Sequence, residues 1–128
     1  MNPIKALIVD DEQDVELLFR QRFRKELRKG EMEFHFAFSA DEALNYLRGL
    51  QPFDVVLLLS DINMPGMNGL ELLKRVKTDF PAHKVVIITA YGDDANRQAA
   101  SALGADDFIT KPVDFKLLRD RLLHFYNV

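Results

Sequence analysis

Four places in this 128-residue chain carry the side chains that a divalent cation and a phosphoryl group require. Asp10 and Asp11 directly follow an apolar run, Asp61 lies at the end of another, Thr89 closes a third and Lys111 follows a fourth. Three carboxylates placed together repel one another and are stabilised by a cation. Because oxygen ligands without histidine or sulfur suit Mg²⁺ or Mn²⁺ better than Zn²⁺, these aspartates predict a magnesium-type site.

Lys111 and Thr89 indicate which ligand would bind beside the cation. Bound magnesium often keeps positions open for phosphate oxygens, while Lys111 adds a positive charge and Thr89 a hydroxyl donor for the remaining phosphoryl oxygens. A carboxylate can also attack phosphorus and form an aspartyl phosphate. The residue types therefore predict phosphoryl transfer to an aspartate.

Elements with two different periodicities must position these residues. Five short runs rich in leucine or β-branched residues, at 6–9, 34–38, 55–59, 85–88 and 108–109, predict strands, and the amphipathic stretches between them predict helices. Three of the strand runs lack polar alternation, which is typical of parallel strands covered on both faces. We expect an α/β fold with a doubly wound, five-stranded parallel sheet in the order 2-1-3-4-5. Ligands then bind at the carboxyl ends of the first and third strands.

Helix limits follow from capping and breaking residues. We predict the first helix over residues 12–29. The boundary residues are Gly30 after the first helix, the capping pair Ser39 and Glu42 before the second, Gly69 and Pro81 around the third, Asp93 or Asp94 and Gly104 around the fourth, and Pro112 before the fifth. The side chains expected to face the core are Val15, Leu18, Phe19, Phe23 and Leu27; Ala43, Leu44 and Leu47; Leu70, Leu73 and Val76; and Leu117, Leu118, Leu122 and Phe125.

Length and composition exclude several protein classes. The length and a composition of 48% hydrophobic and 29% charged residues predict one globular domain spanning residues 1–128. The lack of cysteine excludes disulfides and cysteine zinc sites. The net charge of −3 gives no reason to expect nucleic-acid binding by this domain. The apolar runs are far shorter than the roughly 20 residues that span a membrane, so we expect neither insertion nor export, and a cytoplasmic location.

Taken in order, the polar motifs resemble those of response-regulator receiver domains in bacterial two-component signalling. The matching motifs are Val9-Asp10-Asp11, residues 60–69 (Ser-Asp-Ile-Asn-Met-Pro-Gly-Met-Asn-Gly), Thr89-Ala90, and residues 108–112 (Phe-Ile-Thr-Lys-Pro). The resemblance covers nearly the whole chain and implies the flavodoxin-like fold of five βα units.

The resemblance also implies roles for the matching residues. Asp61 would accept the phosphoryl group. Asp10, Asp11 and Asp61, with the backbone carbonyl of Asn63, would hold Mg²⁺. Lys111 would pair with Asp61 at rest and with a phosphoryl oxygen afterwards, and its bond to the following proline is expected to be cis.

A conformational switch is implied in the same way. Thr89 would move toward the phosphate, and Phe108 would follow from an outward to an inward rotamer, remodelling the surface of the fourth helix, fifth strand and fifth helix. Asn63 and Tyr91 occupy positions that tune how long the phosphoryl group survives, and a bulky Tyr91 would slow hydrolysis. Ala90 would keep the approach to the acceptor open.

One spacing departs from the family pattern. Seven residues separate Asp54 from Asp61, where about five are usual. The two extra residues preserve strand parity, so Asp61 can keep its orientation, but the start of the third strand and the placement of the Pro52 loop stay open.

We predict a phosphorylation-activated switch that takes its phosphoryl group from a sensor histidine kinase, a phosphotransfer protein or a small donor. It would control a downstream effector or homodimerisation and would have no external turnover substrate. One alternative is a degenerate receiver that acts as a phosphate-independent interaction module. Another is a phosphatase or phosphomutase, which generally needs an acid where this chain has Asn63. The basic residues of 20–29 predict a solvated helix face or a kinase-docking face. We expect either a stand-alone regulator or a receiver that is part of a larger protein.

Overall fold

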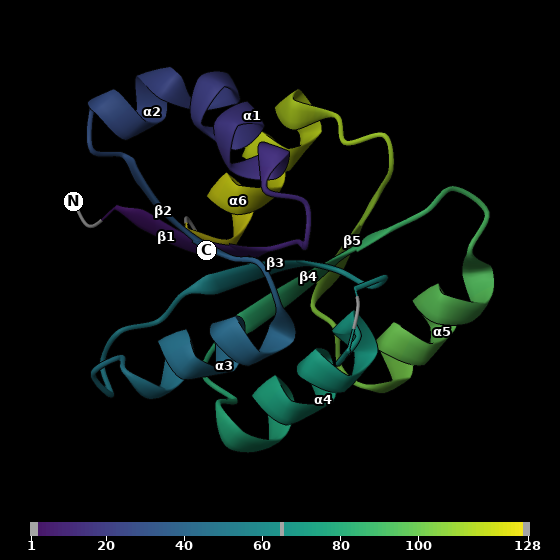
Figure 1. The fold of residues 1–128 in the computed structure, drawn as a ribbon. Helices are drawn as coiled ribbons and strands as arrows, with labels where there is room; N and C mark the ends of the chain where they lie inside the picture. Colours follow the sequence, from purple (N-terminus) through teal and green to yellow (C-terminus); the bar gives the residue numbers. More distant parts are fainter. Residues whose placement is uncertain (1–2, 65, 127–128) are drawn as a thin grey trace.

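The computed structural model describes residues 3–64 and 66–126, so Pro65 of the 60–69 motif and the residues at both chain ends lie outside the described part. It has a five-stranded, fully parallel sheet in the order β2-β1-β3-β4-β5, which confirms the predicted fold class (Figure 1). The strands are β1 (Ile4–Val9), β2 (Met32–Ala37), β3 (Leu57–Asp61), β4 (Lys84–Thr89) and β5 (Asp107–Thr110). The helices are α1 (Asp14–Arg22), α2 (Arg24–Arg28), α3 (Ala40–Arg48), α4 (Gly69–Asp79), α5 (Asp94–Ala102) and α6 (Phe115–Tyr126).

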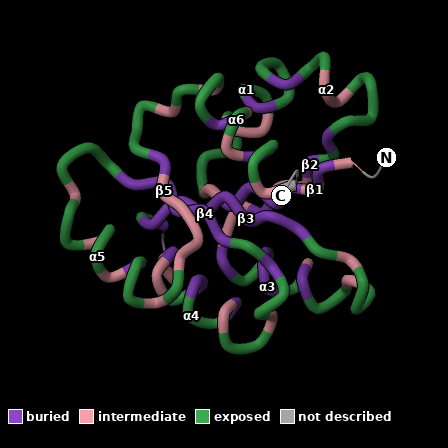
Figure 2. The backbone as a smooth tube through the Cα atoms, turned by 180° about the vertical axis from the view of Figure 1, so that it is seen from behind, coloured by how far each residue is buried: buried purple, intermediate pink, exposed green. Residues whose placement is uncertain are grey.

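Helices cover both faces of the sheet. In Figure 1, α1, α2 and α6 lie on one face and α3, α4 and α5 on the other. Side chains of β1 alternate between the two layers, with Ile4, Ala6 and Ile8 in one core cluster and Leu7 and Val9 in the other. Figure 2 shows the central strands as mostly buried, as expected for strands covered on both faces.

The two core layers differ in composition. The layer between the sheet and α1, α2 and α6 contains aromatic rings in edge-to-face contact, with ring centroids 5.2 Å apart for Phe23 and Phe34 and 5.3 Å apart for Phe19 and Phe115. The α3–α5 layer is built mainly from aliphatic side chains, including Leu44 of α3.

The predicted first helix is interrupted at Phe23. This residue has φ −111° and ψ 24° and separates α1 from α2. The hydrogen bonds on either side persist, since Phe23 N–H donates to Phe19 O (3.0 Å) and Leu27 N–H donates to Phe23 O (2.9 Å). Because these hydrogen bonds continue through Phe23, the interruption is a local change of direction within one helical segment. The Phe23 ring itself is fully buried.

Two leucines predicted to face the core lie at its margin. Leu18 and Leu117 are each 40% exposed, whereas the next residues, Phe19 and Leu118, are buried. Neighbouring residues on a helix diverge by about 100°, so only one of each apolar pair can point directly at the sheet. On α4 the same effect buries Leu72, which was not predicted, and leaves Leu70 partly buried.

Most predicted boundaries are confirmed. The Ser39 side chain accepts from Glu42 N–H (3.1 Å), and the Glu42 carboxylate reaches back to Phe38 N–H (2.7 Å). Asp93, not Asp94, caps α5 by accepting from Asn96 N–H. Gly30 and Gly104, which follow α2 and α5, have positive φ values, as is common after helices.

The third strand begins two residues later than predicted. Val55 is 43% exposed, and β3 starts at Leu57. The Val56 N–H donates to Nδ1 of the buried His83 at 3.0 Å, so an imidazole satisfies this amide in place of a neighbouring strand. The extra residues between Asp54 and Asp61 therefore precede the strand ladder.

No helix in residues 3–64 or 66–126 combines the length and the apolar character needed to cross a bilayer.

Candidate functional site

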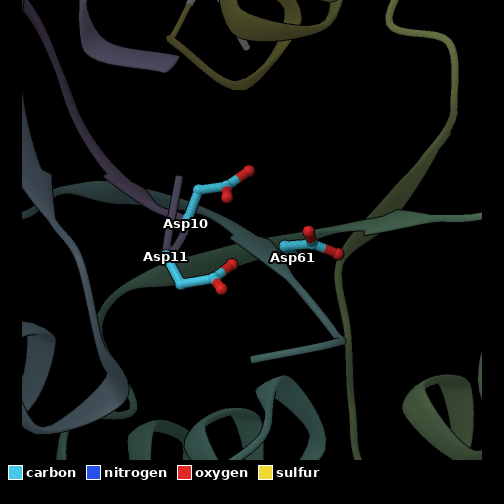
Figure 3. A group of neighbouring side chains, drawn as sticks. All are labelled: Asp10, Asp11 and Asp61. Atoms are coloured by element: carbon cyan, nitrogen blue, oxygen red, sulfur yellow. The ribbon is translucent and has the colours of Figure 1, made fainter. Parts of the chain in front are cut away.

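Three carboxylates meet at the carboxyl end of the sheet. Asp10 and Asp11 directly follow β1, and Asp61 is the last residue of the adjacent strand β3. One carboxylate oxygen from each residue lies within 4.8 Å of the others, and Figure 3 shows the side chains of Asp10 and Asp11 extending toward Asp61. The parallel register of β1 and β3 thus places together residues that are about 50 positions apart in the sequence.

Backbone hydrogen bonds fix the first carboxylate. Asp10 N–H donates to Ala37 O (3.1 Å), which extends the β1–β2 pairing by one residue. The Asp10 side chain accepts from Glu12 N–H (3.0 Å) and is partly buried, while Asp11 is exposed.

Asp61 is the most buried of the three, with 6% of its surface exposed. Lys111 Nζ lies 2.7 Å from Asp61 Oδ2, a charge-assisted hydrogen bond. The other carboxylate oxygen, Oδ1, has a longer contact of 3.4 Å with Asn63 N–H. One oxygen of Asp61 is thus held by the lysine, and the other has only a weak protein partner.

The lysine arrives from two strands away. Lys111 follows β5, and its N–H donates to Thr89 O (2.8 Å), which continues the β4–β5 pairing past the end of β5. The peptide bond between Lys111 and Pro112 is cis, as predicted. The side chain therefore crosses the end of β4 to reach Asp61 at the end of β3.

Charges at this edge perturb one another. Burial raises the pKa of Asp10, and the neighbouring Asp61 and Asp11 carboxylates add to the rise, while the Glu12 N–H and Lys111 oppose it. Burial alone would lower the pKa of Lys111, but its hydrogen bond and attraction to Asp61, with smaller attraction from Asp10, raise it. One lysine faces three carboxylates, so the cluster has an excess of negative charge.

This donor set fits a hard divalent cation. All three side chains offer carboxylate oxygens, and no other group of three or more acids, histidines or cysteines with metal-ligand spacing occurs in the described residues. The residues that could hold Mg²⁺ or Mn²⁺ are Asp10, Asp11 and Asp61, with the exposed Asn63 next to them in the loop after β3.

The remaining predicted residues surround this edge. Thr89 is buried at the end of β4, one residue beyond the position paired with Asp61, and no hydrogen bond in the described part of the chain joins it to Asp61. Phe108 is partly buried on β5, with the Arg97 guanidinium 5.0 Å from its ring centroid. Ala90 is exposed in the following loop, as is Tyr91, at 88%.

Two further contacts at the site were not predicted. A β-carbon on Gly69 would lie 2.3 Å from Asp61 O, so only glycine fits where α4 begins against the end of β3. Gly69 N–H also donates to Ile62 O (2.8 Å). A glycine at a helix start, where helix-forming residues are usual, is the sequence signal that could have revealed this contact. The Arg97 contact with Phe108 had no sequence signal.

Comparison with known proteins points to one family. Residues 6–123 match the family model described as the response regulator receiver domain. The chain is 36% identical over 122 residues to sporulation initiation phosphotransferase F of Bacillus subtilis, covering 91% of this chain and 88% of that protein. It is 40% identical over 121 residues to response regulator protein PilR of Pseudomonas aeruginosa, covering 94% of this chain but only 25% of that protein.

Solved structures show the same architecture. A putative response regulator from Chloroflexus aurantiacus superposes with a TM-score of 0.78 at 30% identity, covering 94% of this chain and 95% of that one. The receiver domain of a Francisella response regulator superposes with a TM-score of 0.81 at 27% identity, covering 98% of both chains.

Proposed function

Because the chain belongs to the response regulator receiver domain family of two-component systems, we propose that it is a phosphorylation-activated switch with Asp61 as the phosphoacceptor. The observation that carries this proposal is the environment of Asp61. Its buried carboxylate has Lys111 Nζ at 2.7 Å and the Asp10 and Asp11 carboxylates on another side, within 4.8 Å. One edge of the sheet therefore carries a buried carboxylate, two further carboxylates and a fixed positive charge, which supports the proposed roles of nucleophile, cation ligands and phosphoryl-oxygen partner.

The proposed reaction is an in-line transfer. An Asp61 carboxylate oxygen attacks the phosphorus of a phosphohistidine, the new O–P bond forms as the P–N bond breaks, and the imidazole leaves. Lys111 then pairs with a phosphoryl oxygen in place of Asp61. Asp10 and Asp11, with Asp61 and the Asn63 carbonyl, would hold Mg²⁺, which supplies charge neutralisation for the phosphoryl oxygens when bound.

The response to phosphorylation would use Thr89 and Phe108. We infer that the Thr89 hydroxyl moves toward the phosphoryl group and that Phe108 turns inward into the space this leaves. The ring would then move away from Arg97, its neighbour on α5 at 5.0 Å. The surface formed by α5, β5 and α6 would change, altering an effector contact or homodimerisation in an equilibrium that phosphorylation biases.

Several finer assignments belong to the same proposal. The phosphoryl donor would be a sensor histidine kinase, a phosphotransfer protein or a small acyl phosphate, and such partners imply a cytoplasmic location. Tyr91 would shield the phosphoryl group from water, so Tyr91→Ala is expected to speed dephosphorylation. An unchanged dephosphorylation rate would remove Tyr91 from the proposal. Ala90 and Asn63 would set access beside the acceptor.

Intact mass spectrometry after incubation with acetyl phosphate and Mg²⁺ tests the core of the proposal. We expect a gain of one phosphoryl group in the wild type and none in Asp61→Asn or in the metal-free sample. Asp54→Asn, which removes a carboxylate before the other end of β3, is the matched control and should gain the group normally.

Three results would contradict the proposal. A mass gain that persists in Asp61→Asn would place the acceptor elsewhere. The absence of any gain with acetyl phosphate and with a panel of phosphorylated histidine kinases would instead favour the phosphate-independent interaction module. Steady turnover of an external phosphomonoester would favour the alternative function of a phosphatase or phosphomutase.

A further inference from the structure

A cavity of 260 Å³ lies at the opposite end of the sheet from the aspartates, between α2, α6 and the starts of β1 and β2. Ile4 and Met32, which are register partners on these strands, are both buried and line the cavity. Asp10 follows the other end of β1, so the strand rise places the cavity about 20 Å from the aspartates. In Figure 1, α2 lies near the amino-terminal end of β1.

The wall on α6 combines one apolar and one charged side chain, Leu123 and Arg119. Leu123 lines the cavity and is 39% exposed. Arg119 forms an ion pair with Glu26 of α2 (2.7 Å), donates to Arg22 O (3.1 Å) and lies 5.0 Å from the Phe23 ring centroid. Because Arg119 and Glu26 neutralise each other, neither contributes much free charge at the cavity mouth.

The wall on α2 has unpaired positive charge. Lys25 and Lys29 line the cavity, and Arg24 and Arg28 lie beside them on the same short helical segment. All four are exposed, and no ion pair joins any of them to an acid within residues 3–64 and 66–126. Of the two acids that line the cavity, Glu26 is paired with Arg119, and Glu31 has no ion pair to a residue in the described part of the chain.

This arrangement of charge is unfavourable for the isolated domain. The pairs Arg24/Arg28 and Lys25/Lys29 are like charges at the i,i+4 spacing, which destabilises a helix. The helix dipole favours cations near the last turn and offsets part of this repulsion. The chain carries a net charge of −3. Four cations on a five-residue helix and its cap, none of them in an ion pair with a described residue, are therefore a local concentration of positive charge in an acidic protein.

We propose that this cavity and the α2 cations form a docking site for an acidic protein segment that carries one large apolar side chain. The acidic residues would lie along Lys25 and Lys29, and the apolar side chain would enter against Ile4, Met32 and Leu123. The cavity is smaller than the roughly 300–1,000 Å³ typical of small-molecule sites, so its size suits a single anchoring side chain. Being remote from Asp61, the site would work whether or not the domain is phosphorylated.

The test uses the ¹⁵N-labelled full chain and a synthetic ten-residue peptide of Glu and Asp with one central Phe. We expect NMR shift changes concentrated at residues 23–32 and 119–123. The double variant Lys25→Glu/Lys29→Glu should raise the Kd about tenfold, because two attractions become repulsions. Leu123→Asp should also weaken binding, and Asp61→Asn should leave it unchanged.

Matched controls separate this site from general charge attraction. Lys74→Glu/Arg75→Glu makes the same charge change on exposed residues of α4, on the other face of the sheet, and should bind as the wild type does. The peptide with Phe replaced by Ala should bind more weakly. If the Lys25/Lys29 charge reversal prevents folding, Lys25→Gln/Lys29→Gln provides the same comparison with a smaller effect.

Three outcomes would overturn the proposal. The first is no shift change, or changes located elsewhere. The second is equal binding by Lys25→Glu/Lys29→Glu and the wild type. The third is binding that is indifferent to the Phe and equalled by a DNA oligonucleotide of the same charge, which would make α2 a general polyanion surface.

Discussion

Replacing Gly69 with alanine should destabilise the protein, although an alanine at this helical position would ordinarily do the opposite. Gly69 begins α4 and has an ordinary negative φ, since the glycines with positive φ in the described residues are Gly30, Gly66, Gly92 and Gly104. Backbone conformation therefore gives no reason to require glycine. Helix propensity alone favours alanine over glycine by about 0.5–1 kcal/mol.

Steric contact opposes this gain. The alanine β-carbon would lie 2.3 Å from Asp61 O and 2.7 Å from Ile62 Cα, well inside the 3.5–4.0 Å of ordinary carbon contacts. Both neighbours are backbone atoms, so relief requires α4 or the end of β3 to move. Overpacking of this kind costs about 1–3 kcal/mol, and we expect a net loss of about 1–2 kcal/mol in the free energy of unfolding. Because the displaced backbone carries Asp61, the rate of phosphorylation should fall as well.

Urea unfolding at neutral pH measures the stability change, and the acetyl phosphate reaction followed by mass spectrometry measures the rate. Gly49→Ala is the matched control, because a β-carbon there would be no closer than 3.6 Å to its neighbours. The control should be neutral or slightly stabilising and should be phosphorylated normally. Equal stability of Gly69→Ala and the wild type would show that the backbone of Asp61 and Ile62 does not exclude a β-carbon at this position.

Three further results are expected. Without metal and above pH 6, Asp10→Asn should raise the free energy of unfolding by roughly 0.5–1 kcal/mol, because it relieves carboxylate repulsion. Mg²⁺ at ten times its Kd should stabilise the wild type by about 1.4 kcal/mol but should not stabilise Asp10→Asn. Equal responses of the two proteins to Mg²⁺ in urea unfolding would contradict a role of Asp10 in cation binding. Lys111→Met should slow phosphorylation by about 10²-fold or more while Lys116→Met does not, as a time course of intact mass would reveal. Burial lowers the pKa of His83, so the stability held by its neutral ring is present above its unfolded value near 6.5 and is lost as pH falls through the lower folded value. His83→Leu should therefore lose about 1–3 kcal/mol at pH 8, and a penalty that failed to shrink toward pH 5 in urea unfolding would count against this role.

The placement of the site could be predicted because it depends on local patterns and on one topological rule. The runs that became β1 and β3 were recognisable from composition, and parallel pairing puts their carboxyl ends on one edge. Asp10, Asp11 and Asp61 had to meet there once the strand order was assumed. The cap at Ser39 and the end of the first helical segment at Gly30 also follow from nearest-neighbour chemistry.

Features that depend on contacts between distant segments could not be predicted. The hydrogen bond from Val56 N–H to His83 joins residues 27 positions apart and moves the start of β3. Leu18 and Phe19 are both apolar, and only the orientation of α1 on the sheet decides which is buried. The change of direction at Phe23 has no sequence signal, because neither glycine nor proline occurs there. The Phe23 ring instead packs among other aromatic side chains that come from distant segments.

The His83 contact separates the length of a loop from the position of the acceptor. Residues 49–56 connect α3 to β3, and within them Phe53 is 79% exposed while the Val56 amide is satisfied by an imidazole outside the loop. The position of Asp61 is set by strand pairing from Leu57 onward, so residues added near Phe53 would meet chiefly the entropy of a longer loop, about 0.6 kcal/mol for each doubling of its length. This connection is therefore where the chain can accept an insertion, such as a reporter segment, without displacing the chemistry at the other end of the strand.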